Sequence, residues 1–242
     1  MDAIRIEGLT KRYRDTVAVD KLSLCIKEGE LFSLLGVNGA GKTTTIKMLS
    51  CLTEPTGGDA YLYEKSIRKN SSEVKSIIAV SPQETAVAPG LSVRENLELM
   101  CGVYGFSREK QNAKIKELSE LLGLESVIFR KSGKLSGGWQ RRLSIAMALI
   151  SEPKILFFDE PTLGLDVIAR SELWDLIRSL KGTVTVILTT HYMEEAEALS
   201  DRIAIMKDGK LIICDTAEKI KEEAGTDNFE AAFVRIVKGV AQ

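Results

Sequence analysis

Hydrophobic residues along the chain form two kinds of short segment. Apolar and polar residues alternate over residues 4–7 and 22–26, which is typical of half-exposed strands in an antiparallel sheet. Four other segments are apolar almost throughout, which indicates strands buried on both faces of a parallel sheet. These segments are residues 31–35, 77–80, 155–158 and 184–188.

Helical periodicity lies between the strand segments. Apolar residues recur at the spacing of an amphipathic helix, as in Ile46, Leu49 and Leu52. Strands that alternate with helices favour a parallel sheet with crossover helices. Residues 84–150 show many helical patterns and no convincing strand. We therefore interpret them as a helical insertion between two parts of the sheet domain.

Two patterns predict the structure of the C-terminal part. Residues 203–206 and 211–214 flank Asp208-Gly209, a pair typical of a hairpin turn. Beyond this hairpin, apolar residues at helical spacing predict one face of a short helix. They are Phe229, Phe233, Ile236, Val237 and Val240.

Each of the four buried segments leads into residues suited to phosphate chemistry. The first leads into residues 36–43, the second into Gln83, the third into Asp159-Glu160 and the fourth into His191. In open α/β sheets, ligands bind at the carboxyl ends of the strands. We therefore expect these four places to converge on one site.

Composition places the chain among soluble globular proteins. Of its 242 residues, 44% are hydrophobic and 28% are charged. The net charge of −1 gives no electrostatic reason to expect a nucleic-acid partner. The basic cluster at residues 11–14 (Lys-Arg-Tyr-Arg) we interpret as a solvated surface turn.

Cysteines and hydropathy exclude several kinds of protein. The four cysteines (Cys25, Cys51, Cys101 and Cys214) form no CxxC pair, and the chain has a single histidine, so a Cys/His zinc site is hard to build. We expect reduced, mostly buried thiols of a cytosolic protein. No stretch approaches the ~20 uninterrupted apolar residues of a spanning helix. A membrane role is therefore expected only through a partner.

A glycine-rich segment after the first buried strand matches G-x-x-x-x-G-K-[ST], the phosphate-binding loop. Small residues let the backbone N–H groups surround a triphosphate, and the following helix N-terminus favours negative charge. Lys42 is expected to reach the β- and γ-phosphates of ATP, and the Thr43 hydroxyl to bind Mg²⁺. The predicted ATP-binding residues here are Gly36, Val37, Asn38, Gly39, Ala40, Gly41, Lys42, Thr43 and Thr44.

Two adjacent carboxylates end the third buried strand. Asp159 suits Mg²⁺ coordination, directly or through water. Glu160 suits a general base that deprotonates the attacking water. A solvated acidic turn before Pro161 would be the plainer interpretation if this segment stood alone.

A second glycine-rich segment opens a predicted helix. Ser136, Gly137 and Gly138 precede residues that continue apolar through Leu149. A serine and two glycines at a helix N-terminus form a second surface that can bind an anion. An ordinary helix cap explains the same residues equally well.

With these motifs in order, the chain resembles a nucleotide-binding domain of the ABC ATPase superfamily. Residues 36–43 resemble Walker A, residues 157–160 Walker B, and residues 135–138 the family signature. By this resemblance Gln83 is the Q-loop glutamine, with a catalytic role and a place at Mg²⁺. The resemblance further implies that Asp166 lies in the D-loop, that His191 is the catalytic switch histidine, and that Tyr13 stacks on adenine. Trp139 and Val167 stand where Gln and Pro are more usual.

The resemblance implies a P-loop NTPase fold: a RecA-like α/β core with an antiparallel edge sheet and an inserted helical subdomain. The core is expected over residues 1–83 and 151–220, the signature subdomain over 84–150, and a short C-terminal helical segment over 221–242. Two subunits are expected to enclose ATP head to tail, so that Ser136–Gly138 of one faces the phosphate loop of the other. The partners implied are a second nucleotide-binding subunit and an integral-membrane permease, at the cytoplasmic face of the membrane.

The short C-terminal segment resembles that of type-2 exporters, which include drug, antibiotic and sodium efflux ATPases. Two other functions remain open. One is a non-transport ABC ATPase of DNA repair or translation, although the long insertion of repair types and the paired domains of translation types are not seen. The other is a regulatory module without turnover, against which Glu160 and His191 argue.

Overall fold

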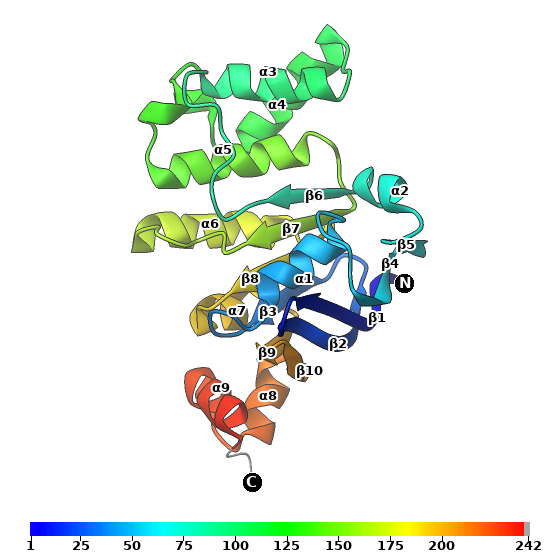
Figure 1. The fold of residues 1–242 in the computed structure, drawn as a ribbon. Helices are drawn as coiled ribbons and strands as arrows, with labels where there is room; N and C mark the ends of the chain where they lie inside the picture. The colour runs from blue at the N-terminus through cyan, green and yellow to red at the C-terminus, as the bar shows by residue number, and fades with distance from the viewer. Residues whose placement is uncertain (240–242) are drawn as a thin grey trace.

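The computed structural model describes residues 1–239, and a six-stranded sheet lies at its centre (Figure 1). The strand order is β10-β9-β3-β8-β7-β6. The five strands from β9 to β6 run parallel, and β10 pairs antiparallel at one edge. The strands are β3 (Leu31–Leu35), β6 (Ile78–Ser81), β7 (Ile155–Asp159), β8 (Thr185–Thr190), β9 (Arg202–Lys207) and β10 (Lys210–Asp215). The four predicted buried segments are therefore confirmed as parallel strands.

A second, antiparallel sheet of four strands lies beside the first, in the order β2-β1-β4-β5. It contains β1 (Asp2–Tyr13), β2 (Thr16–Lys27), β4 (Gly57–Leu62) and β5 (Lys65–Ser66). The predicted antiparallel strands are thus present, but each extends well beyond the alternating segment. The surface turn predicted at residues 11–14 is wrong for its first three residues, which belong to β1. Only Arg14 and Asp15 form the turn, because β1 and β2 stay paired up to Tyr13–Thr16.

Helices cover the central sheet and extend beyond its β6 edge, where α3, α4 and α5 lie together (Figure 1). Residues 84–150 contain helices and no strand, as predicted. One isolated bridge, Ser92–Lys131, also occurs there. The helices are α1 (Lys42–Leu49), α2 (Ser71–Lys75), α3 (Val93–Val103), α4 (Arg108–Leu122), α5 (Gly137–Leu149), α6 (Val167–Ser179), α7 (Met193–Leu199), α8 (Ala217–Glu223) and α9 (Phe229–Lys238), with 3-10 turns at Glu125–Val127 and Ser132–Lys134. Within residues 1–239, no helix is long and apolar enough to cross a membrane.

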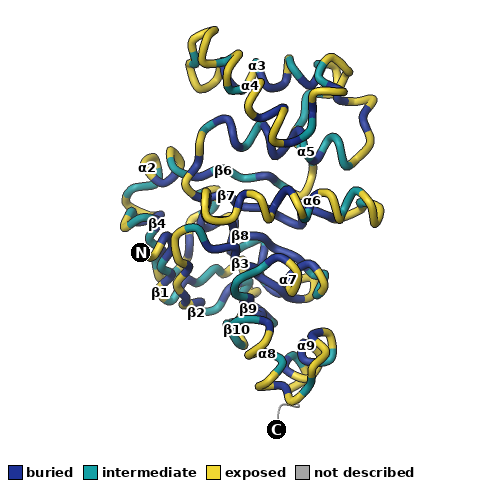
Figure 2. The backbone as a smooth tube through the Cα atoms, turned by 180° about the vertical axis from the view of Figure 1, so that it is seen from behind, coloured by how far each residue is buried: buried dark blue, intermediate teal, exposed yellow. Residues whose placement is uncertain are grey.

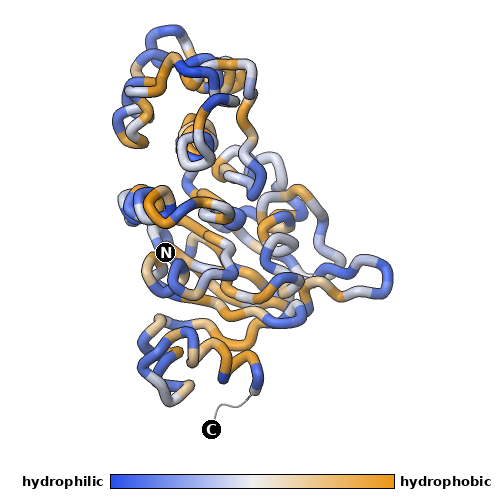
Figure 3. Tube along the Cα trace, turned by 90° about the vertical axis from the view of Figure 1, so that its left-hand side faces the viewer, coloured by the Kyte–Doolittle hydropathy of each residue, from blue (hydrophilic) through white to orange (hydrophobic). Residues whose placement is uncertain are grey.

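The central strands are buried on both faces, as their unbroken apolar sequence predicts (Figure 2). Neighbouring residues of a strand point to opposite faces. Phe157 accordingly packs with α1 and the antiparallel sheet, whereas Phe158 packs with helices α3 to α6. Both side chains are fully buried. Figure 3 shows the hydrophobic segments gathered in these strands and hydrophilic segments in the connecting loops.

The C-terminal part follows the predicted pattern. Lys207 pairs with Lys210 across the turn, and both Asp208 and Gly209 have positive φ, as a two-residue hairpin of this type requires. Phe229, Phe233 and Ile236 of α9 are buried, and Val237 packs partly against the same cluster. Val240, also predicted for this face, lies outside the described residues.

The cysteines depart from expectation. All four are free, but only Cys101 is buried. Cys25 is exposed, because in β2 it lies between the inward-facing Leu24 and Ile26 and therefore points outward. Cys51 and Cys214 are half-buried. The prediction of mostly buried thiols is wrong.

Candidate functional site

The loop between β3 and α1 depends on glycine at two positions. A Cβ at Gly36 would lie 2.5 Å from the Met206 carbonyl oxygen. At Gly41, φ is 101° and a Cβ would lie 2.4 Å from the Ala18 carbonyl oxygen. A side chain at either position would therefore clash with the backbone of a neighbouring strand or loop. These contacts explain why the loop needs glycine where the motif has it.

Lys42 is the first residue of α1 and is 5% exposed. Its Nζ donates to the Gly36 carbonyl at 2.7 Å and the Val37 carbonyl at 3.3 Å. The ammonium group is thus held over the loop by the loop's own backbone. Gly41 precedes the helix without a side-chain cap, so the first N–H groups of α1 remain available to an anion.

Asp159 is fixed at the end of β7 by two hydroxyl groups. Thr43 Oγ1 donates to Asp159 Oδ1 at 3.0 Å, and Thr189 Oγ1 donates to the same oxygen at 2.6 Å. The strand ends β7 and β8 and helix α1 therefore meet at this carboxylate. Thr189 was not among the predicted residues, although a hydroxyl at the end of a buried strand was a visible signal.

Glu160 lies between a histidine and a lysine. Its Oε2 is 2.7 Å from His191 Nδ1, and its Oε1 is 3.5 Å from Lys42 Nζ. The Glu160 side chain is 9% exposed. Its φ of 51° lies in the left-handed region, which non-glycine residues rarely adopt. Backbone strain of this kind clusters at functional sites.

Gln83 lies in the loop after β6, and its carbonyl accepts a hydrogen bond from a buried arginine. Arg141 of α5 is 4% exposed and donates to the carbonyls of Pro82 and Gln83, at 2.6 Å each. Burial lowers the pKa of Arg141. This role could not be predicted from the sequence, since Arg141 stands beside a second arginine and both resemble surface residues.

These residues surround one cavity of about 660 Å³. That volume is typical of a small-molecule site. The lining brings together all four predicted strand ends, as well as Tyr13, which is 45% exposed and lies under Lys11 Nζ, 5.0 Å from the ring centre. The lining residues are Tyr13, Thr16, Val17, Ala18, Asn38, Gly39, Ala40, Gly41, Lys42, Thr43, Thr44, Gln83, Glu160, Leu163, His191 and Asp208. Of the predicted residues, Gly36, Val37 and Asp159 stand just behind this lining.

The second glycine-rich segment and Asp166 do not line the cavity. Ser136 stands at the N-cap of α5, but its hydroxyl makes no capping hydrogen bond. Asp166, by contrast, caps α6 by accepting from the Ala169 N–H at 2.9 Å. The ordinary-cap interpretation therefore does not explain Ser136, whose side chain is free for another partner.

The oxygens of Thr43 and Asp159 fit a magnesium ion. Mg²⁺ in nucleotide sites uses one or two carboxylates together with substrate phosphates and water. The 3.0 Å contact between Thr43 and Asp159 brings two such oxygen atoms together next to the phosphate loop. No cluster of three or more His, Cys, Asp or Glu residues that could hold a metal ion occurs within residues 1–239.

Comparison with known families gives one match, the family described as ABC transporter, over residues 19–163. Among curated proteins, the chain is 39% identical to the "Probable multidrug ABC transporter ATP-binding protein YbhF" of Escherichia coli, over 97% of this chain and 41% of that protein. It is 38% identical to the daunorubicin resistance ATP-binding protein DrrA2 of Streptomyces coeruleorubidus, over 99% of this chain and 77% of that protein. The chain therefore spans less than half of the first relative and most of the second.

Among solved structures, the chain is similar to the dimeric ATP-binding cassette MJ0796 in a post-hydrolysis state with ADP and Pi bound. The TM-score is 0.78 and the sequence identity 29%, over 88% of this chain and 98% of that one. The match therefore covers most of both chains.

Proposed function

The chain belongs to the ABC transporter ATP-binding family, whose domains bind and hydrolyse ATP, and we propose that it powers export through a separate membrane permease. The observation that carries this proposal is the arrangement around Glu160. The backbone of Glu160 is strained, and its carboxylate lies 2.7 Å from His191 Nδ1 and 3.5 Å from Nζ of Lys42 in the phosphate loop. That arrangement has the parts required for ATP hydrolysis, because a base lies beside the cation that binds the γ-phosphate.

In this proposal each cavity residue has a distinct task. Lys42 and the loop N–H groups bind the β- and γ-phosphates, and the exposed ring of Tyr13 stacks on adenine. Thr43, Asp159 and Gln83 hold Mg²⁺, which when bound offsets charge on the phosphates. Glu160 accepts the proton of the attacking water.

His191 completes this arrangement from the end of β8. Its Nδ1 contacts Glu160, so the imidazole orients the carboxylate and keeps it beside the phosphate loop. Asp159, fixed by the hydroxyls of Thr43 and Thr189, keeps its place behind the loop as the nucleotide enters. The residues that bind and the residues that react thus hold one another in position.

The proposal extends to the organisation of the chain. Residues 1–83 and 151–220 form the ATP-binding core, residues 84–150 the signature subdomain, and residues 221–242 a C-terminal segment. The hydroxyl of Ser136 makes no capping hydrogen bond and does not line the cavity of its own subunit, which supports the proposal that it contacts the γ-phosphate of a second subunit. The dimeric state of the similar solved structure supports this shared site.

Two of the relatives support the proposed direction of transport. Their names concern multidrug transport and daunorubicin resistance, which supports export of an organic compound from the cell. We place the chain at the cytoplasmic face of the membrane, where residues 91–97 at the start of α3 meet the permease. Asp166 lies beside the second subunit in this arrangement.

Glu160→Gln tests the proposed hydrolysis. The change keeps the shape of the side chain and removes its proton acceptor, so ATP turnover should fall about 10²- to 10⁴-fold while ATP binding persists. Gel filtration with ATP should then show an accumulated dimer. Glu120→Gln, on α4 with a 58% exposed side chain, is the matched control and should behave as the unmodified protein. Undiminished turnover together with a monomer in ATP would refute the proposal.

A further inference from the structure

Two neighbouring buried side chains, those of Thr162 and Glu195, each carry an oxygen atom without a hydrogen-bond partner. Within residues 1–239, three side-chain oxygens are buried and unpaired: Ser119 Oγ, Thr162 Oγ1 and Glu195 Oε2. Ser119 is in α4, far along the chain, but the Thr162 hydroxyl faces the Glu195 carboxyl. Buried polar atoms nearly always have partners. The unpaired oxygens of Thr162 and Glu195 therefore need a physical explanation.

Glu195 connects three elements that carry the site. It lies on α7, four residues after His191, and is 0% exposed. Trp174 Nε1 on α6 donates to its Oε1 at 3.1 Å. Thr190, which directly precedes His191, and Thr162, two residues after Glu160, face the same carboxyl. One side chain thus contacts α6, the loop after β7 and the end of β8.

Burial is the largest influence on Glu195 and disfavours its ionised form. Hydrogen bonding by Thr190, Thr162 and Trp174 partly offsets this, and Glu160 repels a second negative charge. Arg141 on α5 attracts one, but its guanidinium donates to the carbonyls of Pro82 and Gln83 and forms no ion pair with Glu195 in the described structure. Burial raises the pKa of Glu195. A neutral carboxyl, in addition, has an O–H group that can donate a hydrogen bond to Thr162 Oγ1.

We propose that Glu195 is a positioning residue which, as a neutral carboxylic acid, joins the loop carrying Glu160 to the loop carrying His191. The proposal rests on the proposed roles of those two residues in hydrolysis. In this proposal Oε1 accepts a hydrogen bond from Trp174 Nε1, and the Oε2–H group donates one to Thr162 Oγ1. This link keeps Glu160 and His191 at their 2.7 Å contact while nucleotide enters and leaves. Glu195 itself does not line the cavity.

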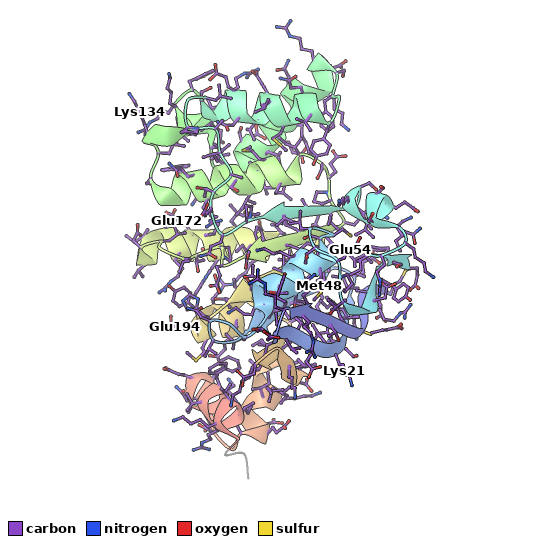
Figure 4. All side chains as sticks on the ribbon, in the orientation of Figure 1. Lys21, Met48, Glu54, Lys134, Glu172 and Glu194 are labelled. Atoms are coloured by element: carbon purple, nitrogen blue, oxygen red, sulfur yellow. The ribbon has the colours of Figure 1, made fainter. Side chains whose placement is uncertain are left out.

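Three variants separate a neutral acid from a charged one. Glu195→Gln retains an acceptor and replaces the O–H by an N–H donor, so kcat should stay near that of the unmodified protein. Glu195→Ala removes the link, and misplacement of reacting groups should lower kcat on the order of 10- to 100-fold with little change in ATP affinity. Glu194→Gln, at the exposed rim of α7 (Figure 4) with an 80% exposed side chain, is the matched control and should leave kcat unchanged.

Infrared spectroscopy tests the protonation state without relying on activity. The unmodified protein at neutral pH should show the C=O stretch of a carboxylic acid, which comes from neutral Glu195. Exposed carboxyls do not contribute to this band, because they are ionised at neutral pH. This band should vanish in Glu195→Gln and remain in Glu194→Gln. Absence of the band from the unmodified protein, or a folded Glu195→Gln variant as inactive as Glu195→Ala, would overturn the proposal. If the unmodified protein hydrolyses no ATP, the proposed function fails, while the band still reports on Glu195.

Discussion

Replacement of Lys42 by alanine tests the nucleotide site at its most specific residue. The Lys42 ammonium is 2.7 Å from the Gly36 carbonyl and 3.5 Å from Glu160 Oε1, in a position 5% exposed. Without it, the triphosphate loses its main side-chain cation. Hydrogen bonds to charged groups contribute about 1.5–3 kcal/mol. The dissociation constant for ATP should therefore rise roughly 10- to 150-fold.

Equilibrium titration with a fluorescent ATP analogue, without magnesium, measures this effect directly. Lys47→Ala is the matched control, because Lys47 lies on the same helix but is exposed. Its affinity should equal that of the unmodified protein. A folded Lys42→Ala variant with unchanged affinity would mean that the triphosphate binds elsewhere.

Stability must be followed in the same variant. Lys42→Ala leaves the Glu160 carboxylate buried with only His191 beside it, and loss of one partner from a buried pair destabilises a protein. The free energy of unfolding should therefore fall. In the double variant Lys42→Ala/Glu160→Gln the unpaired charge is removed, so stability should recover while ATP affinity stays low. Recovery of both together would attribute the affinity loss to misfolding instead.

Three further predictions follow from the site. His191→Ala should lower kcat roughly 10²-fold with little change in ATP affinity, because its contact is with Glu160. Steady-state kinetics measures kcat, and a loss of ATP affinity as large as the loss of kcat would contradict this prediction. Tyr13→Ala should weaken ATP binding roughly 5- to 150-fold if the ring stacks on adenine, whereas Tyr13→Phe should not, and titration distinguishes the two. Because burial raises the pKa of Glu195 above its ordinary value of 4.5, the folded state keeps a proton that the unfolded state releases, so stability falls as pH rises above that value. Denaturant unfolding should show a smaller decrease with pH in Glu195→Gln, and identical slopes would contradict the assignment.

Much of the fold could be predicted from the sequence, because its strands are buried on both faces. Segments such as residues 155–158 are apolar throughout, and only a strand inside a covered sheet explains them at that length. The candidate site residues were predicted from the same pattern, since the phosphate loop begins directly after β3, and Glu160 and His191 directly follow β7 and β8. Parallel strands bring their carboxyl ends to one edge, so residues distant in sequence meet there.

Residues defined by long-range contacts could not be predicted in this way. Arg141 and Glu195 are charged residues in helical segments, which in sequence resemble an exposed helix face. Arg141 is buried where the carbonyls of Pro82 and Gln83, from another part of the chain, accept its hydrogen bonds. The exposure of Cys25 is likewise a matter of which strand face it occupies, which a change of one residue in register would reverse.

The β4–β5 hairpin was missed for a local reason. β4 begins with Gly57 and Gly58, which disfavour a strand, and its remaining residues are few. Pairing with β1 overrides this preference, since Ile4 and Ile6 lie opposite Leu62 and Ala60. The neighbouring strand, rather than the segment's own composition, determines the structure here.

A mixing experiment tests the shared ATP site most directly. Ser136→Arg places a bulky side chain at the N-cap of α5, outside the cavity of its own subunit, so ATP binding should stay near normal while hydrolysis is lost. Lys42→Ala subunits should also hydrolyse little ATP at concentrations below their raised dissociation constant, but they keep a normal Ser136. Mixed together, the two variants should rebuild one site, from the phosphate loop of the first and Ser136 of the second, and recover part of the ATPase activity. Hydrolysis at the unmodified rate by Ser136→Arg alone would contradict the account.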